Sequence, residues 1–202
     1  MSLLFGNNFI NNSEFASNTT NNLCGLFYGI TTLIDASNLI LPATVCTESC
    51  YNGMFRGCTN LITAPQLPAT QSAKECYGSM FEGCINLEVA PEINLVNLSS
   101  QCCKRMFCMD RNNKITTPKM TKSPILRSAT GASGCYDEMF KGNGNLIEVT
   151  CLLTDNSGSV SNWLSNCSSV GTFYKSPLKT NWPTDTTSGI PSGWTVVDYV
   201  ES

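Results

Sequence analysis

The feature that most constrains the fold of this chain is an internal repeat. Residues 50–61 and 76–87 both read Cys-Tyr-x-x-Met-Phe-x-Gly-Cys-x-Asn-Leu, and they lie 26 residues apart. A third copy follows at Met106 after another 26 residues, and a fourth follows at Met139 after 33. A fixed period of this length indicates a solenoid, in which each copy is one coil and stacking buries the faces that no single coil can bury.

Each copy predicts one strand and one short helical segment. Cys, Met-Phe and Cys recur at steps of three or four residues, which is typical of one apolar stripe on a short helix or 3₁₀ turn. The following Asn-Leu-x-x-Ala-Pro predicts a brief strand that proline ends. Degenerate copies at 26–33 and around Trp163 bring the expected total to about six coils.

The predicted fold class is therefore an α/β repeat, a solenoid with short strands on one face and short helices or 3₁₀ turns on the other, capped at both ends. We expect an N-terminal cap with a degenerate first repeat at 1–38, the repeat solenoid at 39–170 and a C-terminal capping segment at 171–202. The longer fourth spacing predicts an insertion around residues 119–131.

The cysteines occupy repeat positions, so equivalent thiols should form columns along the solenoid. One column is predicted at Cys50, Cys76, Cys102 and Cys135, and another at Cys58, Cys84 and Cys167. The favoured interpretation is buried free thiols that act as small apolar residues. Disulfides are sterically possible between neighbouring coils. Zinc favours Cys-x₂₋₄-Cys pairs, whereas the recurrent spacing here is Cys-x₇-Cys.

Composition argues against catalysis and against nucleic acid as a partner. The chain has no histidine, which excludes Ser-His-Asp and Cys-His chemistry, and it has no phosphate-binding glycine loop. Charged residues make up 13% of the chain, the net charge is -3, and no basic cluster appears. We therefore predict no enzymatic activity, no cofactor and no metal; a glycosidase pair drawn from Glu88, Glu92 and Glu148 is the remote alternative.

The N-terminal region predicts production without export through a signal peptide. Residues 1–8 carry no basic residue, and their apolar stretch ends after Phe5. No apolar run approaches the roughly 20 residues of a membrane span. We expect cytoplasmic production and a final location on a virion or at a cell surface.

The motif Met-Phe-x-Gly-Cys-x-Asn-Leu, followed by a strand that ends at proline, resembles the BspA-like (Treponema-type) leucine-rich repeat. The resemblance is carried by residues 54–61 and 80–87 and, in degraded form, by 139–146. The use of Met at the first position and of Leu-Pro-Ala-Thr as the return looks like proteins of gut Bacteroidales, such as Bacteroides, and their phages. The resemblance implies a right-handed leucine-rich-repeat solenoid without a cofactor.

The same resemblance implies a function in adhesion, because characterised members of that family are mostly surface adhesins and similar repeats occur in phage appendages. Two departures from the repeat predict a kink or bulge: the third copy reads Phe-Cys-Met-Asp at 107–110, and the fourth has Asn143 in place of the second cysteine.

Outward residues of successive strands should form the ligand face, since solenoids bind along extended surfaces. The predicted face consists of Thr63, Gln66, Glu88, Glu92, Thr117, Lys119, Glu148 and Thr150. Two rival sites are the insertion, counted from Lys119 to Thr130, and the aromatic C-terminal segment with Phe173, Tyr174, Trp182 and Trp194. The alternative for these aromatics is that they cover the last coil.

Taken together, these features predict a non-enzymatic module for attachment or receptor recognition. Its partner would be a protein or glycan at a cell surface, and the module would belong to a phage tail fibre, another virion appendage or a bacterial adhesin. The alternative is a structural virion protein that docks on other phage proteins. Neither nucleic acid nor a membrane span is expected, and the sequence leaves the oligomeric state open.

Overall fold

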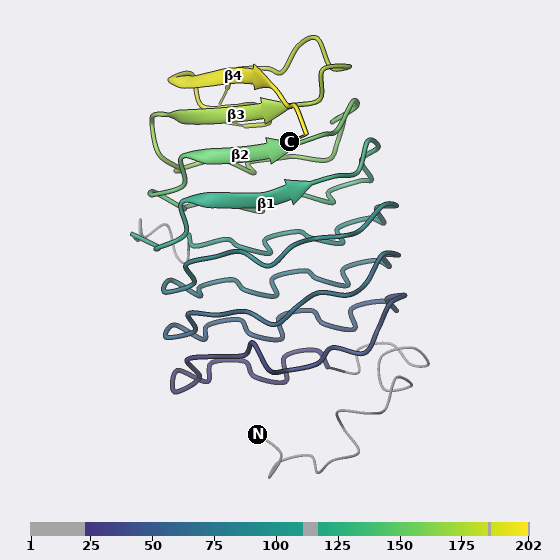
Figure 1. Ribbon diagram of the computed structural model, residues 1–202, viewed down its shortest axis with the longest axis vertical. Coiled ribbons are helices and arrows are strands. Elements are labelled where there is room, and N and C mark those ends of the chain that lie inside the picture. The colour runs from purple at the N-terminus through teal and green to yellow at the C-terminus, as the bar shows by residue number, and fades with distance from the viewer. Residues whose placement is uncertain (1–22, 111–116, 186, 202) are drawn as a thin grey trace.

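The chain folds as a parallel β-solenoid in the computed structural model, which describes residues 23–110, 117–185 and 187–201. Four strands, β1 (Lys122–Leu126), β2 (Glu148–Cys151), β3 (Gly171–Lys175) and β4 (Trp194–Asp198), form one parallel sheet in chain order. Each strand lies directly above its predecessor in the stack (Figure 1). The expectation of a repeat solenoid is therefore confirmed.

The N-terminal half continues the same stack with shorter pairing. Isolated parallel bridges join Asp35 to Thr63 and Thr63 to Val89 on the strand side, and a second series joins Val45, Gln71 and Asn97. Regular sheet is thus confined to β1–β4, whose three crossovers amount to about three turns. The prediction of about six coils, each with a strand and a helix, is wrong in that form, because proline shortens the early strands to single bridges.

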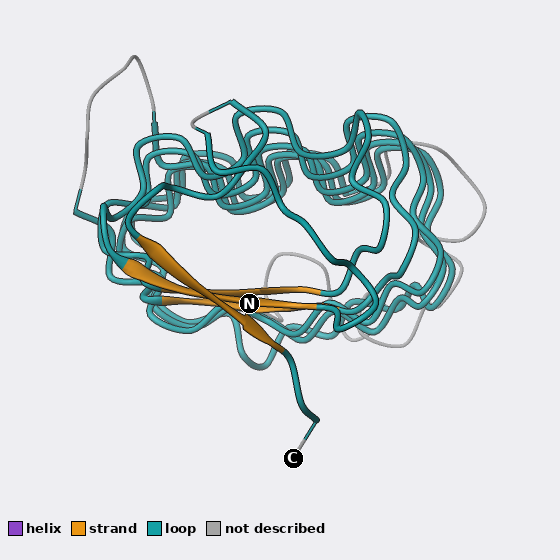
Figure 2. Ribbon diagram, turned by 90° about the horizontal axis from the view of Figure 1, so that it is seen from above, coloured by secondary structure: helices purple, strands orange, loops and turns teal. Residues whose placement is uncertain are grey.

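No helix occurs among the described residues, so the prediction of short helices or 3₁₀ turns is also wrong. The expected helical segments form a layer of consecutive β-turns opposite the sheet (Figure 2). We call this layer the turn stack; it consists of residues 47–58, 73–84, 99–108, 132–143 and 156–167. Every fourth residue has a positive φ, as at Ser49 (54°), Gly53 (59°) and Gly57 (76°), a value that no right-handed helix contains.

Hydrogen bonding explains why this ribbon of turns is stable without helical bonds. Even-numbered amides of 47–58 donate within the coil, as Asn52 N–H does to the Ser49 carbonyl (3.1 Å). Odd-numbered amides donate to the next coil, as Gly53 N–H does to the Gly78 carbonyl (2.8 Å). Half of the main-chain donors therefore close turns and the other half join coils, which leaves few buried polar groups unpaired.

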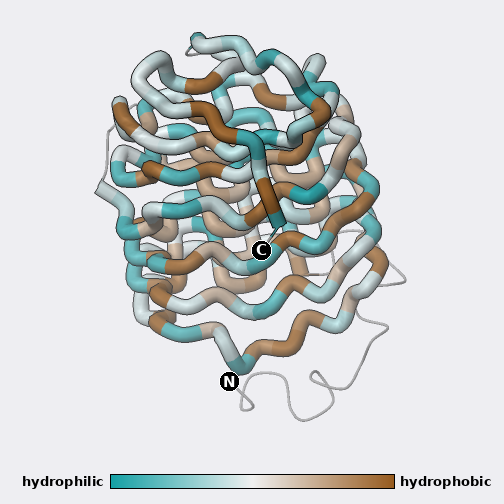
Figure 3. The backbone as a smooth tube through the Cα atoms, turned by 45° about the horizontal axis from the view of Figure 1, so that its top comes forward, coloured by the Kyte–Doolittle hydropathy of each residue, from teal (hydrophilic) through white to brown (hydrophobic). Residues whose placement is uncertain are grey.

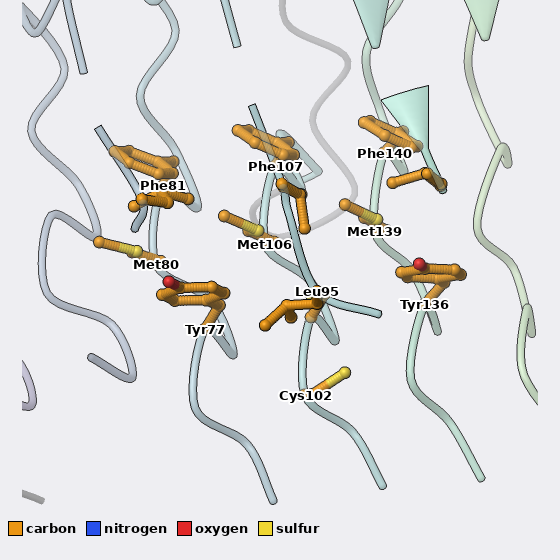
Figure 4. Packing of buried hydrophobic residues seen from close by; sticks show 14 of the residues in the cluster. Tyr77, Met80, Phe81, Leu95, Cys102, Met106, Phe107, Tyr136, Met139 and Phe140 are labelled. Carbon is orange, nitrogen blue, oxygen red and sulfur yellow. The ribbon is translucent and has the colours of Figure 1, made fainter. Parts of the chain in front are cut away.

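The core lies between the two layers and consists of columns of like residues (Figure 4). Phe27, Phe55, Phe81, Phe107 and Phe140 form one continuous stack with ring centroids 5.4 to 5.7 Å apart. Hydrophobic segments accordingly recur at matching places of successive coils (Figure 3). The steps from Phe55 to Phe81 and from Phe81 to Phe107 are the 26-residue period, and in every step the side chain meets its own equivalent in the next coil.

The predicted first thiol column is buried, whereas the second is interrupted, because the coil of Asn143 lies between those of Cys84 and Cys167. Members of the first column and the first two members of the second are fully buried, whereas Cys167 is partly exposed, and all 12 cysteines carry free thiols. Thiols of the second column also donate hydrogen bonds to phenylalanine carbonyls, as Cys84 Sγ does to Phe55 (3.1 Å). Asn143 performs the same task, because its Nδ2 donates to the Phe107 carbonyl (2.6 Å).

Asn143 therefore keeps the stack regular where a kink was expected. An irregularity does occur nearby, as a register shift between Lys122 and Ile125 in β1. The residues predicted as an insertion around 119–131 contain this strand and so form part of the sheet.

The C-terminal segment also belongs to the sheet, since β3 and β4 both lie beyond the boundary expected at residue 170. Its aromatic residues pack on the last coil: Trp182 stacks on Trp163 at 5.4 Å and meets the edge of Phe173 at 4.9 Å. The expected N-terminal cap falls mostly in 1–22, outside the described residues.

Candidate functional site

Two adjacent grooves lie on the strand side, where the early coils lack regular sheet. The first has a volume of about 380 Å³ and is bounded by residues 88–94 on one coil and 121–127 on the next. The second, of about 360 Å³, is bounded by 63–68 and 89–94. Val89, Ala90, Glu92 and Asn94 line both grooves, so the two form one continuous surface across three coils.

Proline creates this surface. Pro65, Pro68 and Pro91 have no N–H to donate, and a strand ladder cannot continue through them. Beyond the bridge between Thr63 and Val89, no hydrogen bond joins the main chain of 65–67 or of 91–94 to any other described residue. The grooves are therefore lined by peptide groups that retain their capacity to bond a ligand.

The floor of the grooves is aliphatic. Val89, which lines both grooves, is 76% exposed. Ala64, Leu67, Ile93 and Ile125 contribute further apolar surface. Exposed apolar side chains that gather in a hollow, rimmed by polar groups, mark an interaction site.

Ion pairs neutralise most charges around the first groove. Lys119 Nζ lies 3.1 Å from Glu88 Oε1, and Lys122 Nζ lies 3.1 Å from Glu148 Oε2. Arg127, at the end of the groove, pairs with Glu201 at 2.9 Å. Glu92 is exposed and has no ion pair or hydrogen bond with another described residue, so it is the uncompensated charge of this surface.

The structure brings most of the predicted ligand face together. The grooves are lined by Thr63, Gln66, Glu88 and Glu92. Lys119 lies beside them, because it forms an ion pair with Glu88. Two other predicted residues lie outside the groove linings: Thr117 is exposed, and partly exposed Glu148 pairs with Lys122.

The prediction that Thr150 belongs to the ligand face is wrong, because only 7% of its surface is exposed. Its neighbours in the sheet register are Ile125 and Tyr174, and these larger residues flank the threonine on both sides. Alternation along a strand indicates which way a side chain points, but it does not indicate how much its cross-strand neighbours cover it.

The rival insertion site is part of the same surface. Residues 121–125 and Arg127 form one wall of the first groove, so the predicted face and the predicted insertion are one site. Lys122, Ser123 and Arg127 were predicted only as part of the insertion, because strand β1 was not recognised from the sequence. The aromatic rival does not form an open site, since Phe173, Trp182 and Trp194 are buried.

Nothing in the described residues resembles a metal centre, since no group of three Cys, Asp or Glu side chains is placed to hold an ion. Three of the buried thiols are also poorly suited to nucleophilic chemistry. Burial raises the pKa of Cys108 to about 11, and it raises the pKa of Cys135 and of Cys151 to about 12. A thiol with such a pKa stays protonated near neutral pH, whereas the thiolate is the reactive form.

Thiol labelling checks this picture. Brief treatment of the native protein with iodoacetamide should modify Cys24, the exposed cysteine, and should modify partly exposed Cys167 more slowly. Intact-mass spectrometry should show all 12 sites modified after unfolding in guanidinium. Cys24→Ser should remove the fast site, and rapid native modification of Cys76 or Cys84 would contradict the buried columns.

Comparisons with known proteins identify no relative: no family model, no curated protein and no solved structure matches the chain. None of the described segments is a helix long and apolar enough to cross a membrane.

Proposed function

We propose that this chain is a non-enzymatic binding module for attachment, which recognises a protein or glycan at a cell surface through the two strand-side grooves. The proposal includes the leucine-rich-repeat character inferred from the motif, with Leu61, Leu87 and Leu146 as buried core positions. The module would act on a virion appendage or as a surface adhesin.

The observation that carries the proposal is the unpaired main chain of 65–67 and 91–94 beside exposed Val89. A folded chain normally covers or pairs such groups, and here they line a hollow that spans three coils. The flanking carboxylates of Glu88 and Glu148 are engaged in ion pairs, an arrangement that suits orientation of a partner better than proton transfer.

Cell binding by a matched pair of variants tests the proposal. Val89→Asp places a charge on the groove floor, whereas Val96→Asp places the same charge at a valine that is 55% exposed and lines neither groove. We expect fluorescently labelled protein to bind intact gut Bacteroidales cells, with binding lost in Val89→Asp and retained in Val96→Asp.

Equal loss in both variants would contradict the assignment of the grooves. Absence of binding to any cell, together with co-purification of the protein with phage particles, would contradict attachment and favour structural docking on other virion proteins.

A further inference from the structure

The chemistry of the grooves narrows the class of ligand, if the proposed function holds. None of the described residues that line them is aromatic; the linings consist of aliphatic, proline, small polar and charged side chains. A ring of a ligand usually stacks on the face of an aromatic side chain. Here the tyrosines of the repeat, Tyr51 and Tyr77, are buried in the core. A flat ring therefore has no partner on this surface.

The main chain of the grooves favours a peptide ligand. Residues 65–67 and 91–94 offer both N–H and C=O groups without a partner in the described chain. An extended polypeptide presents the complementary groups at regular intervals, and main-chain pairing of this kind supplies affinity while side-chain pockets supply specificity. Apolar side chains of such a segment would pack on Val89 and Ala90.

The unpaired negative charge of Glu92 indicates one side chain of the ligand. Glu92 lies between the grooves, lines both and has no cationic partner, whereas Glu88, Lys122 and Arg127 are each paired within the protein. A lysine or arginine of the ligand would supply the missing positive charge.

We infer that the paired grooves bind one extended polypeptide segment, with its main chain along 65–67 and 91–94 and a Lys or Arg side chain on Glu92. Both grooves belong to the same occupant because residues 89–94 separate and line them together.

Selection from a displayed library of random linear peptides tests this inference. Peptides enriched on the wild-type protein should contain a basic residue among aliphatic ones. Glu92→Gln should weaken their binding about fivefold at low salt, since an exposed ion pair contributes up to about 1 kcal/mol. Glu48→Gln, a control at an exposed carboxylate outside the grooves, should leave binding unchanged.

Charge reversal and salt provide independent readouts. Selection on Glu92→Lys should enrich acidic peptides, and added salt should weaken binding to the wild type more than binding to Glu92→Gln. Enriched peptides without basic residues, or equal effects of Glu92→Gln and Glu48→Gln, would overturn the inference.

Failure of the inference is distinguishable from failure of the proposed function. Val89-dependent binding to cells and to a glycan array, with no peptide enriched, would overturn the peptide inference and leave attachment standing. Peptide binding without any binding to cells would instead overturn attachment.

Discussion

Replacement of Phe81 by alanine is expected to lower the free energy of unfolding by about 3–5 kcal/mol, which is the usual cost of deleting a buried phenylalanine. Phe81 is fully buried between Phe55 and Phe107, with ring centroids at 5.4 and 5.6 Å. The variant leaves a cavity that neighbouring coils cannot close, because hydrogen bonds of the turn stack fix their spacing, as between Phe81 N–H and the Met106 carbonyl (2.9 Å).

Urea unfolding followed by circular dichroism measures this effect. Phe27→Ala is the matched control, because Phe27 ends the stack, keeps 7% of its surface exposed and contacts one phenylalanine of the stack, Phe55. We expect a smaller loss there. Equal losses at the two positions, or a loss below about 1 kcal/mol for Phe81→Ala, would contradict a stack held together by like residues.

Replacement of Arg105 by methionine is expected to destabilise the protein by about 3 kcal/mol at neutral pH, because it leaves a buried carboxylate short of its main partner. The Glu82 side chain is 2% exposed, and its oxygens lie 3.1 Å from Arg105 Nη2 and 3.0 Å from Arg56 Nη2. Arg105 also bonds Glu138, so the charges form a chain across successive coils.

The pH dependence of this loss identifies the carboxylate. Burial raises the pKa of Glu82, but hydrogen bonds from Arg105 and Ser79 and the charges of Arg105 and Arg56 outweigh it, so the pKa lies below its ordinary 4.5. A lowered pKa in the folded state stabilises the protein above pH 4.5, and this contribution disappears as the pH falls through the folded pKa. The loss of unfolding free energy in Arg105→Met should therefore shrink toward pH 4. Unfolding measured at a series of acidic pH values tests this expectation.

Two further variants separate this network from ordinary surface charge. Lys74→Met removes an exposed ion pair with Glu48 and should cost less than about 1 kcal/mol. Adding Glu82→Gln to Arg105→Met should recover part of the loss, because the uncompensated charge is then gone. A loss in Arg105→Met that does not change with pH would exclude Glu82 as its cause.

The repeat predicted the parts of the fold that depend on equivalence between coils. Because Cys50, Cys76 and Cys102 occupy one position of the period, their burial in one column followed directly. The same reasoning placed Thr63, Gln66, Glu88 and Glu92 on one face, and the structure brings them to the grooves.

The local backbone could not be predicted in this way. A stripe of apolar residues at steps of three and four fits a helix, but a ribbon of β-turns buries the same side chains. The difference lies in positive φ angles at Ser49, Glu75 and Gln101, residues whose types give no sign of them. Glycine at 53, 57 and 83, where φ is positive, was the signal available in the sequence.

The site was only partly predictable, because it depends on where pairing stops. Proline in the return segments indicated the end of a strand, but not that two neighbouring coils would leave their main chains unpaired together. The insertion at 119–131 also concealed β1, which supplies the opposite wall of the first groove.

Hydrogen exchange of individual amides, followed by NMR, distinguishes the paired main chain of the turn stack from the unpaired main chain of the groove lining. Gly53, Phe55 and Tyr77, whose amides bond the next coil, should exchange slowly. Glu92 and Asn94, whose amides have no partner among the described residues, should exchange close to the rate of an unstructured chain. Protection of Glu92 and Asn94 equal to that of Tyr77 would show a continuous strand ladder in place of the grooves and would contradict the proposed binding surface.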